Sequence, residues 1–373
     1  MARSRGEGTL FQRKDGRWQA SLQVNGVRKT VYGRTRQEAA RKLGELQRQA
    51  MDTGALPDAG TKTVNDLLDR WLETAAPTLK ARTIESYEQT CRLYVRPTLG
   101  RVRIDRLAPN RIQRLYTALQ KRGLRRAPAK AHAVLHRALK LAVLWGWLAE
   151  NPSERVLRPQ YRPQRKKVWT PWELNAFLTR TPGHWLYPMW VLGLVTGCRL
   201  GELRALAWDD VDLEAGTVCV AKTLERIQGV WSITDPKTKS GIRTVALPPE
   251  GVTALRTQKT QQAEWRAQAG DDWREWGLVF TQWTGEPLHG ATVAHGLKRE
   301  CQRLGITPLT PHGLRHLHAS LLLGEGLPVP LVSARLGHAT PAITMAVYAH
   351  VVNQADKTAA EAMGKVLRRV NSI

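Results

Sequence analysis

Two stretches of this 373-residue chain lack a regular hydrophobic period and divide it into segments. Residues 56–62 combine proline with glycine, and residues 151–167 hold three prolines among several arginines and lysines. Proline and glycine interrupt helices and strands, so such stretches typically connect domains. The length allows two or three domains, each with its own core. We expect domains over residues 1–56, 62–152 and 169–373, with residues 153–168 as a basic linker.

The first segment has the alternating pattern of β-strands. Its central run places four apolar side chains on one face, namely Trp18, Ala20, Leu22 and Val24. An Asn-Gly pair at 25–26 is a strong hairpin turn, from which the chain returns over residues 27–32, and residues 10–12 predict an earlier strand. A capping box at Thr35 opens a helix that ends near Gln49. The pattern predicts a small three-stranded sheet with one helix, which could also be a small basic adaptor.

The second segment has helical spacing throughout. After Thr63, which forms a capping box with Asp66, apolar residues recur at intervals of three and four: Val64, Leu67, Leu68, Trp71 and Leu72. Turns are expected at residues 97–100 and at Gly123. Further helices are expected over residues 81–95, 108–121 and 127–149. This segment predicts a compact helical bundle.

The charge of the chain is strongly and unevenly positive. The net charge is +25, with 12 basic against 5 acidic side chains in residues 1–56, 24 against 9 in residues 57–168, and 21 against 18 in residues 169–373. Such a large excess of positive charge repels itself unless a polyanion binds to it. We therefore expect the front half of the chain to bind DNA. Each candidate phosphate contact could equally be a solvated charge. The candidates are Lys80, Arg82, Arg122, Arg125, Arg126, Lys130, Arg165, Lys166 and Lys167.

The third segment mixes helices with short strands. Thr170 opens a capping box, and an apolar helix over residues 185–195 ends at a Thr-Gly break just before Arg199. Glu202 follows three residues later, close enough to orient a cation, although a structural ion pair would explain both residues equally well. Strands are expected over residues 218–221, 230–234, 243–247 and 278–280, and helices from 249 onward and over 292–304. The whole chain predicts a multidomain α+β protein whose last domain is mainly α with a small antiparallel sheet.

A chemically rich stretch runs from Pro308 to Tyr348. Thr310 followed by proline is a helix start, so His312 falls in the first turn and Arg315 on the same face. A helix N-terminus that carries an imidazole and a guanidinium suits a phosphate group, and the natural guest is a phosphodiester. A short apolar helix over residues 331–336 should then end at a glycine and place His338 just beyond it.

No metal site is expected. His312 and His316 are four residues apart on a helix, but no glutamate lies between them as in a metalloprotease, and no cysteine cluster supplies further ligands. The four cysteines are scattered, which is typical of reduced thiols in a cytoplasm: Cys91, Cys198, Cys219 and Cys301. No signal peptide or membrane-spanning run is recognised, so the protein is expected to be cytoplasmic and associated with the nucleoid.

Four short motifs follow one another in the third segment. They are TGCRLGEL at residues 196–203, HGLRH at 312–316, LGH at 336–338 and YAH at 348–350. Together they resemble the signature of the tyrosine recombinase (phage integrase) family, and several ordered motifs at compatible spacing are a specific signal.

The resemblance implies roles for the motif residues. Tyr348 would be the nucleophile that attacks a DNA phosphodiester and forms a 3′-phosphotyrosyl intermediate. Arg199 and Arg315 would clamp the non-bridging oxygens. His312 and His338 would donate hydrogen bonds to the same group.

A lysine and a glutamate complete the implied site. In the family a lysine from a K-[ST]-G turn protonates the departing 5′-oxygen, which indicates Lys239, or Lys237 if the register is shifted. Glu202 would support these cationic side chains without contacting the phosphate itself. The resemblance implies no metal, ATP or other cofactor.

The front of the chain resembles the family as well. Residues 1–56 resemble an arm-type DNA-binding domain of phage and conjugative-transposon integrases, and residues 62–152 a SAM-like core-binding domain. The implied partners are double-stranded DNA attachment sites and three further copies of the chain in a tetramer on a Holliday junction, with an excisionase or a host DNA-bending protein as accessory factors. The tail over residues 354–370 could dock on a neighbouring subunit or on its own domain.

We therefore expect a site-specific integrase of a prophage or another mobile element. A type IB topoisomerase uses similar chemistry but needs no arm-like domain, and a non-catalytic DNA-binding protein would have no reason to carry every catalytic residue type in order. The attachment sequence, the preference for integration or excision, and the role of residues 261–277 stay open at this stage.

Overall fold

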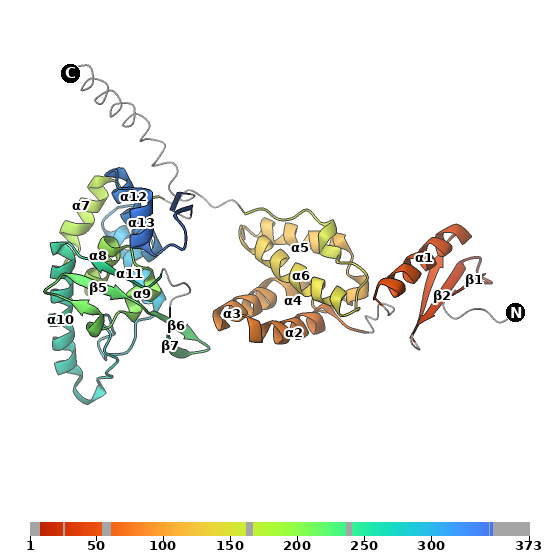
Figure 1. Ribbon diagram of the computed structural model, residues 1–373, viewed down its shortest axis with the longest axis horizontal. Coiled ribbons are helices and arrows are strands. Elements are labelled where there is room, and N and C mark those ends of the chain that lie inside the picture. The colour runs from red at the N-terminus through yellow and green to blue at the C-terminus, as the bar shows by residue number, and fades with distance from the viewer. Residues whose placement is uncertain are drawn as a thin grey trace, which may run out of the picture. The chain divides into compact units, whose positions relative to one another are not determined.

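The computed structural model describes residues 8–24, 27–53, 61–161, 167–235, 241–342 and 344–345. The chain divides into two compact units, Met1–Pro163 and Gln164–Ile373. Helices dominate, and the strands form small antiparallel sheets (Figure 1). The predicted α+β class is therefore confirmed.

The first unit begins with the predicted sheet and helix. The strands lie in the order β1-β2-β3, and Val24 pairs with Val27. The predicted Asn-Gly turn at 25–26 lies outside the described residues. The helix packs its apolar face, including Ala39 and Leu43, against Ala20 and Leu22 of the sheet. It runs past the predicted end near Gln49. The elements are β1 (Thr9–Gln12), β2 (Trp18–Val24), β3 (Val27–Gly33) and α1 (Arg36–Thr53).

A helical bundle follows in the same unit. Thr63 and Asp66 form the predicted capping box, and the bundle closes around a core that contains Leu67, Trp71 and Tyr116. Its helices are α2 (Val64–Ala75), α3 (Ala81–Thr90), α4 (Arg96–Leu99), α5 (Pro109–Lys121) and α6 (Ala127–Leu144), with a π-helical turn over Cys91–Val95 between α3 and α4.

Two boundaries in the bundle differ from the sequence-based expectation. The turn expected at residues 97–100 begins only at Gly100, because α4 continues the helical path with Pro97 in its first turn, where the missing N–H is tolerated. The last helix ends at Leu144 and not near residue 149, because Gly146 takes the left-handed conformation with φ of 71°. Beyond it, Ser153 is buried and Val156 packs against the bundle core.

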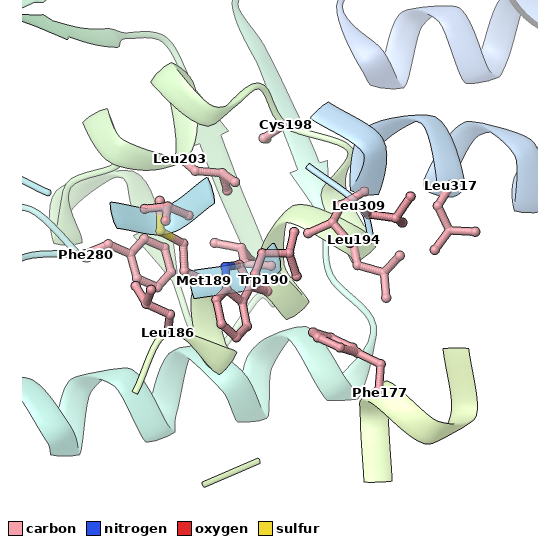
Figure 2. Packing of buried hydrophobic residues seen from close by; sticks show 14 of the residues in the cluster. Phe177, Leu186, Met189, Trp190, Leu194, Cys198, Leu203, Phe280, Leu309 and Leu317 are labelled. Carbon is pink, nitrogen blue, oxygen red and sulfur yellow. The ribbon is translucent and has the colours of Figure 1, made fainter. Parts of the chain in front are cut away.

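The second unit is built around one apolar helix, α8. It packs against the long helix α10 and against α12. Figure 2 shows Met189, Trp190 and Leu194 of α8 among the buried side chains, with Phe177 and Phe280 in the same cluster. The helices are α7 (Pro171–Arg180), α8 (Tyr187–Thr196), α9 (Leu200–Ala205), α10 (Pro249–Ala269), α11 (Gly290–Arg303), α12 (Pro311–Gly324) and α13 (Val329–Leu336).

The strands of the second unit form two sheets instead of the one expected. One has the order β4-β5-β8 and the other is the hairpin β6-β7. The expected strands at 230–234 and 243–247 do not pair with each other, because β7 pairs with β6 through a turn at Gln228 and Gly229 and β8 pairs with β5. Residues 278–280 form only a bridge to Ala207. The strands are β4 (Val211–Asp212), β5 (Thr217–Val220), β6 (Thr223–Ile227), β7 (Val230–Thr234) and β8 (Arg243–Ala246).

Candidate active site

The N-terminus of α12 has the predicted geometry. The Thr310 hydroxyl accepts a hydrogen bond from the amide of Gly313 at 3.1 Å, and Pro311 occupies the first helical position. His312 therefore lies in the first turn, with its ring perpendicular to that of His316 at 4.5 Å between centroids. Arg315, one turn further, has only 2% of its surface exposed. The start of this helix thus directs a buried guanidinium into the unit.

Arg315 reaches the break between α8 and α9. Its Nη1 donates to the carbonyl of Gly197 at 2.7 Å, and its Nη2 is buried without a hydrogen-bond partner among the described residues. Gly197 ends α8 in the left-handed conformation, with φ of 66°. An unpartnered guanidinium N–H is costly when buried, which makes it a donor available to an anion.

Arg199 stands at the same break and is held by Glu202. Its backbone amide donates to Glu202 Oε2 at 2.9 Å and its Nη1 to Oε1 at 2.7 Å. Its Nη2 donates to the carbonyl of Gly337 at 3.3 Å, although the two residues are 138 positions apart. The side chain is 43% exposed. The structure therefore gives Arg199 a fixed orientation and leaves part of its guanidinium open.

His338 follows the left-handed cap at Gly337, as expected. Its Nδ1 lies 2.8 Å from the Thr344 hydroxyl. Since Arg199 touches Gly337 and Arg315 touches Gly197, the motif segments around residues 197–202, 315 and 337–338 meet in one place. Separate parts of the sequence thus build one cationic site.

Burial and neighbouring charges set the protonation of these groups. Burial, followed by the charges of Arg315, Arg199, Arg243 and His312, lowers the pKa of His338 to about 4. His312 itself lies one turn before Arg315, at the N-terminus of α12. Burial and the nearby Arg199 lower the pKa of Arg315 to about 10, which leaves it charged at neutral pH.

Glu202 remains ionised in spite of its position. Burial favours the neutral carboxyl, but the charge and hydrogen bond of Arg243, together with the hydrogen bonds from Arg199, outweigh burial and lower the pKa of Glu202 below its usual value. The side chain is 3% exposed and contacts Arg243 Nη2 at 3.0 Å. At neutral pH the site thus combines three guanidinium groups with one carboxylate.

Sequence reasoning missed Arg243 and Arg335. Arg243 opens β8 and lies behind Glu202, and Arg335 on α13 donates to the carbonyls of Val195 and Ala246. Neither belongs to a motif. The only signal in the sequence is a basic residue at the start of an expected strand, for Arg243, or within a short expected helix, for Arg335.

Other predicted residues belong to the helical bundle or the linker, or lie outside the described residues. Lys239, its alternative Lys237, Tyr348, Arg165 and Lys166 lie outside the described residues, as does the tail. Arg82 pairs with Glu85, and the Arg126 guanidinium lies over the Tyr161 ring. All the remaining DNA-contact candidates are exposed: Lys80, Arg82, Arg122, Arg125, Arg126, Lys130 and Lys167.

The described ranges contain neither a metal-binding cluster nor a membrane-spanning helix. Within them, no cluster of three or more His, Cys, Asp or Glu side chains could hold a metal ion. Over the same residues, no helix is both long enough and apolar enough to span a membrane.

The chain is similar in sequence to known integrases. Residues 172–355 match the phage integrase family, and residues 63–120 match the phage integrase N-terminal SAM-like domain. An integrase of Streptomyces ambofaciens is 32% identical, over 98% of this chain and 98% of its own length. A XerC-like tyrosine recombinase of Caldanaerobacter subterraneus subsp. tengcongensis is 29% identical, over 90% of this chain and 91% of its own length.

Solved structures share the fold. The Tn1549 transposon integrase in complex with transposon right end DNA has a TM-score of 0.68 at 22% identity, covering 81% of this chain and 100% of that one. A lambda integrase tetramer bound to a Holliday junction has a TM-score of 0.61 at 19% identity, covering 93% and 96%. The chain belongs to the phage integrase family of tyrosine recombinases, and it is a site-specific DNA recombinase for the integration of a mobile element.

Proposed function

We propose that Arg199, Arg315, His312 and His338 hold the scissile phosphate of a DNA strand for attack by Tyr348. The observation that carries this proposal is the convergence of motif segments on one site, where Arg199 contacts Gly337 and the Nη2 of Arg315 is buried without a partner among the described residues. Two guanidinium groups match the negative charge that grows on the non-bridging oxygens in the transition state.

The proposed step exchanges one phosphoester for another. The Tyr348 hydroxyl loses its proton to solvent water as its oxygen bonds to phosphorus, the bond from phosphorus to the 5′-oxygen breaks, and the phosphate stays on the 3′-side as a phosphotyrosyl ester. Lys239, or Lys237 in the other register, gives its proton to the leaving 5′-oxygen. The number of phosphoester bonds is unchanged, so the reverse step needs no energy source.

His338 serves this step as a neutral donor. With a pKa of about 4, its ring carries a single N–H at neutral pH. When the Thr344 hydroxyl donates to Nδ1, that hydrogen resides on Nε2. A phosphate oxygen then accepts from Nε2, and Thr344 fixes the tautomer.

We assign the remaining segments by the family match and by their separate cores. Residues 1–56 act as an arm-type DNA-binding domain and residues 62–152 as the core-binding domain. Residues 153–168 form a basic linker, and residues 169–373 form the catalytic domain with its tail.

We propose the partners by analogy with the relatives. Solved relatives carry DNA, and one is a tetramer on a Holliday junction. This supports double-stranded attachment sites and a homotetramer for the present chain, with an excisionase or a host DNA-bending protein as accessory factor. The working compartment would be the cytoplasm, at the nucleoid. The comparisons do not favour a topoisomerase or a non-catalytic DNA-binding protein.

The test is covalent capture on a suicide substrate. A nicked duplex that carries an attachment site loses the short strand beyond the nick after cleavage, so the protein stays bound to the DNA. The wild-type chain should form an adduct that maps to Tyr348. Tyr348→Phe should form none, a loss of at least about 10³-fold, while duplex affinity stays within about threefold because the phenol is not a charged contact.

Tyr94→Phe in the helical bundle provides the matched control and should leave capture unchanged. An adduct of undiminished yield in Tyr348→Phe, or one that maps to another residue, would refute the assignment of the nucleophile.

A further inference from the structure

Arg243 is a buried guanidinium that joins the predicted motif segments. Its side chain is only 8% exposed. Nε donates to the carbonyl of Arg335 at 2.7 Å, and Nη1 donates to the carbonyl of Gly241 at 3.0 Å. Nη2 donates to Glu202 Oε2 at 3.0 Å and lies 3.6 Å from Cys198 Sγ. The Arg243 side chain therefore contacts Glu202 near Arg199, the Arg335 carbonyl in the last turn of α13, and the Gly241 carbonyl.

Glu202 divides its carboxylate between two arginines. Oε1 accepts from Arg199 Nη1 at 2.7 Å, while Oε2 accepts from the Arg199 amide and from Arg243 Nη2. The group of three side chains has a net charge of +1. Glu202 and Arg243 are almost fully buried, whereas Arg199 is 43% exposed. The positive charge of this group is therefore presented where Arg199 is open.

The second arginine changes what Glu202 does to the site. With Arg199 as its single partner, the carboxylate would orient that guanidinium but also cancel its charge. A neutral pair attracts a phosphate much less than a free cation does. With Arg243 behind it, Glu202 can orient Arg199 while a buried cation compensates the carboxylate.

We propose that Arg243 is a positioning residue of the recombinase, which compensates Glu202 so that Arg199 faces the scissile phosphate with an uncancelled positive charge. The proposal rests on the proposed function, because it assigns the phosphate to Arg199. The bonds to the Gly241 and Arg335 carbonyls hold the Arg243 guanidinium in place.

A double-mutant cycle in the full-length protein tests this charge role. The measured quantity is the single-turnover rate of covalent attachment to a nicked suicide duplex at saturating DNA, with the dissociation constant measured separately. Arg243→Gln should slow attachment by roughly 30-fold in the wild-type background, as expected for the coupling of contacting charged groups. In the Glu202→Gln background the same substitution should slow attachment by less than about threefold, because no carboxylate remains to be compensated.

Arg243→Lys separates charge from shape. Lysine keeps the positive charge but loses the directed bonds to two carbonyls, so attachment should stay within about fivefold of wild type even when thermal stability falls as far as in Arg243→Gln. Arg256→Gln, an exposed arginine on α10, is the matched control and should have no effect on attachment.

The role of Arg243 and the proposed function on which it rests fail through different outcomes. Equal losses from Arg243→Gln in both backgrounds, or equally slow Lys and Gln variants, would show that Arg243 only supports the fold. Absence of an adduct at Tyr348 in the wild-type protein would instead overturn the proposed function. If Arg243→Gln does not fold, the comparison of Arg243→Lys with wild type decides: a loss of 30-fold or more in the folded Lys variant overturns the charge role.

Discussion

The imidazole of His318 shows what burial among cations does to a single residue. It lies on α12 one turn after Arg315, and its side chain is 5% exposed. Nδ1 donates to the carbonyl of Leu194 at 2.8 Å, and Nε2 has no partner among the described residues. Burial, followed by the charge of Arg335, lowers the pKa of His318 to about 4. The neutral ring adds no charge to a site that already holds several arginines.

This residue makes the stability depend on pH in a definite direction. The folded protein protonates His318 only near pH 4, whereas the unfolded chain does so near 6.5. Between these values the unfolded state binds more protons, so the free energy of unfolding should fall as the pH is lowered, by up to about 1.4 kcal/mol per pH unit from this group. Urea unfolding of wild type and His318→Gln at several pH values measures that share.

The two pH profiles should differ by about one proton in this window. His136→Gln is the control for His318→Gln, because it also removes a histidine, but a half-buried one from the first unit. If wild type and His318→Gln lose stability in parallel between pH 6.5 and 4, His318 is not the group that titrates.

At the scale of elements, the break between α8 and α9 determines where both arginines lie. Gly197 has φ of 66°, and its carbonyl accepts from Arg315. A Cβ at this position would lie 2.7 Å from the His318 ring and 2.7 Å from a methyl group of Leu336. Both the backbone conformation and the lack of space therefore require glycine here.

Gly197→Ala should lower the free energy of unfolding by about 3 kcal/mol or more, because alanine disfavours the left-handed conformation and its Cβ overpacks the site. It should also slow covalent attachment, since the acceptor of Arg315 is displaced. Gly305→Ala is the matched control, with φ of 69° and no atom near the added Cβ, and should cost about 1 kcal/mol with attachment unchanged. Chemical denaturation and suicide-substrate capture give the two readouts. Equal costs for the two substitutions would mean that the tight packing at Gly197 relaxes freely.

Elements with local start and stop signals could be predicted from the sequence. Thr63 and Thr310 cap their helices within three residues, and Gly337 ends α13, so each boundary depends on neighbouring residues only. The pairing of β8 with β5 was missed, because it joins strands separated by the whole β6-β7 hairpin. Arg243 was missed for a similar reason, since its partners come from α9 and α13.

At the scale of the whole molecule, the positive charge is concentrated before residue 169. Residues 57–168 carry 24 basic against 9 acidic side chains, whereas residues 169–373 carry 21 against 18. Binding of a polyanion releases one counterion for each neutralised phosphate, so affinity should fall steeply with salt, and mainly through the first unit. The nearly balanced residues 169–373 contain the arginines of the candidate site, Arg199, Arg243 and Arg315. The share of each unit in DNA affinity can be tested by removing the same charge from each unit.

The triple substitution Lys80→Gln, Arg122→Gln and Lys130→Gln removes three exposed cations from the helical bundle. If they contact phosphates, the slope of log affinity against log salt should become shallower by roughly 2 to 3, with attachment at saturating DNA unchanged. The control removes three exposed cations from α10, namely Arg256, Lys259 and Arg266. Both proteins lose the same net charge, so an equal change of slope would show that DNA responds to total charge, whereas a change confined to the bundle variant would locate the phosphate contacts there.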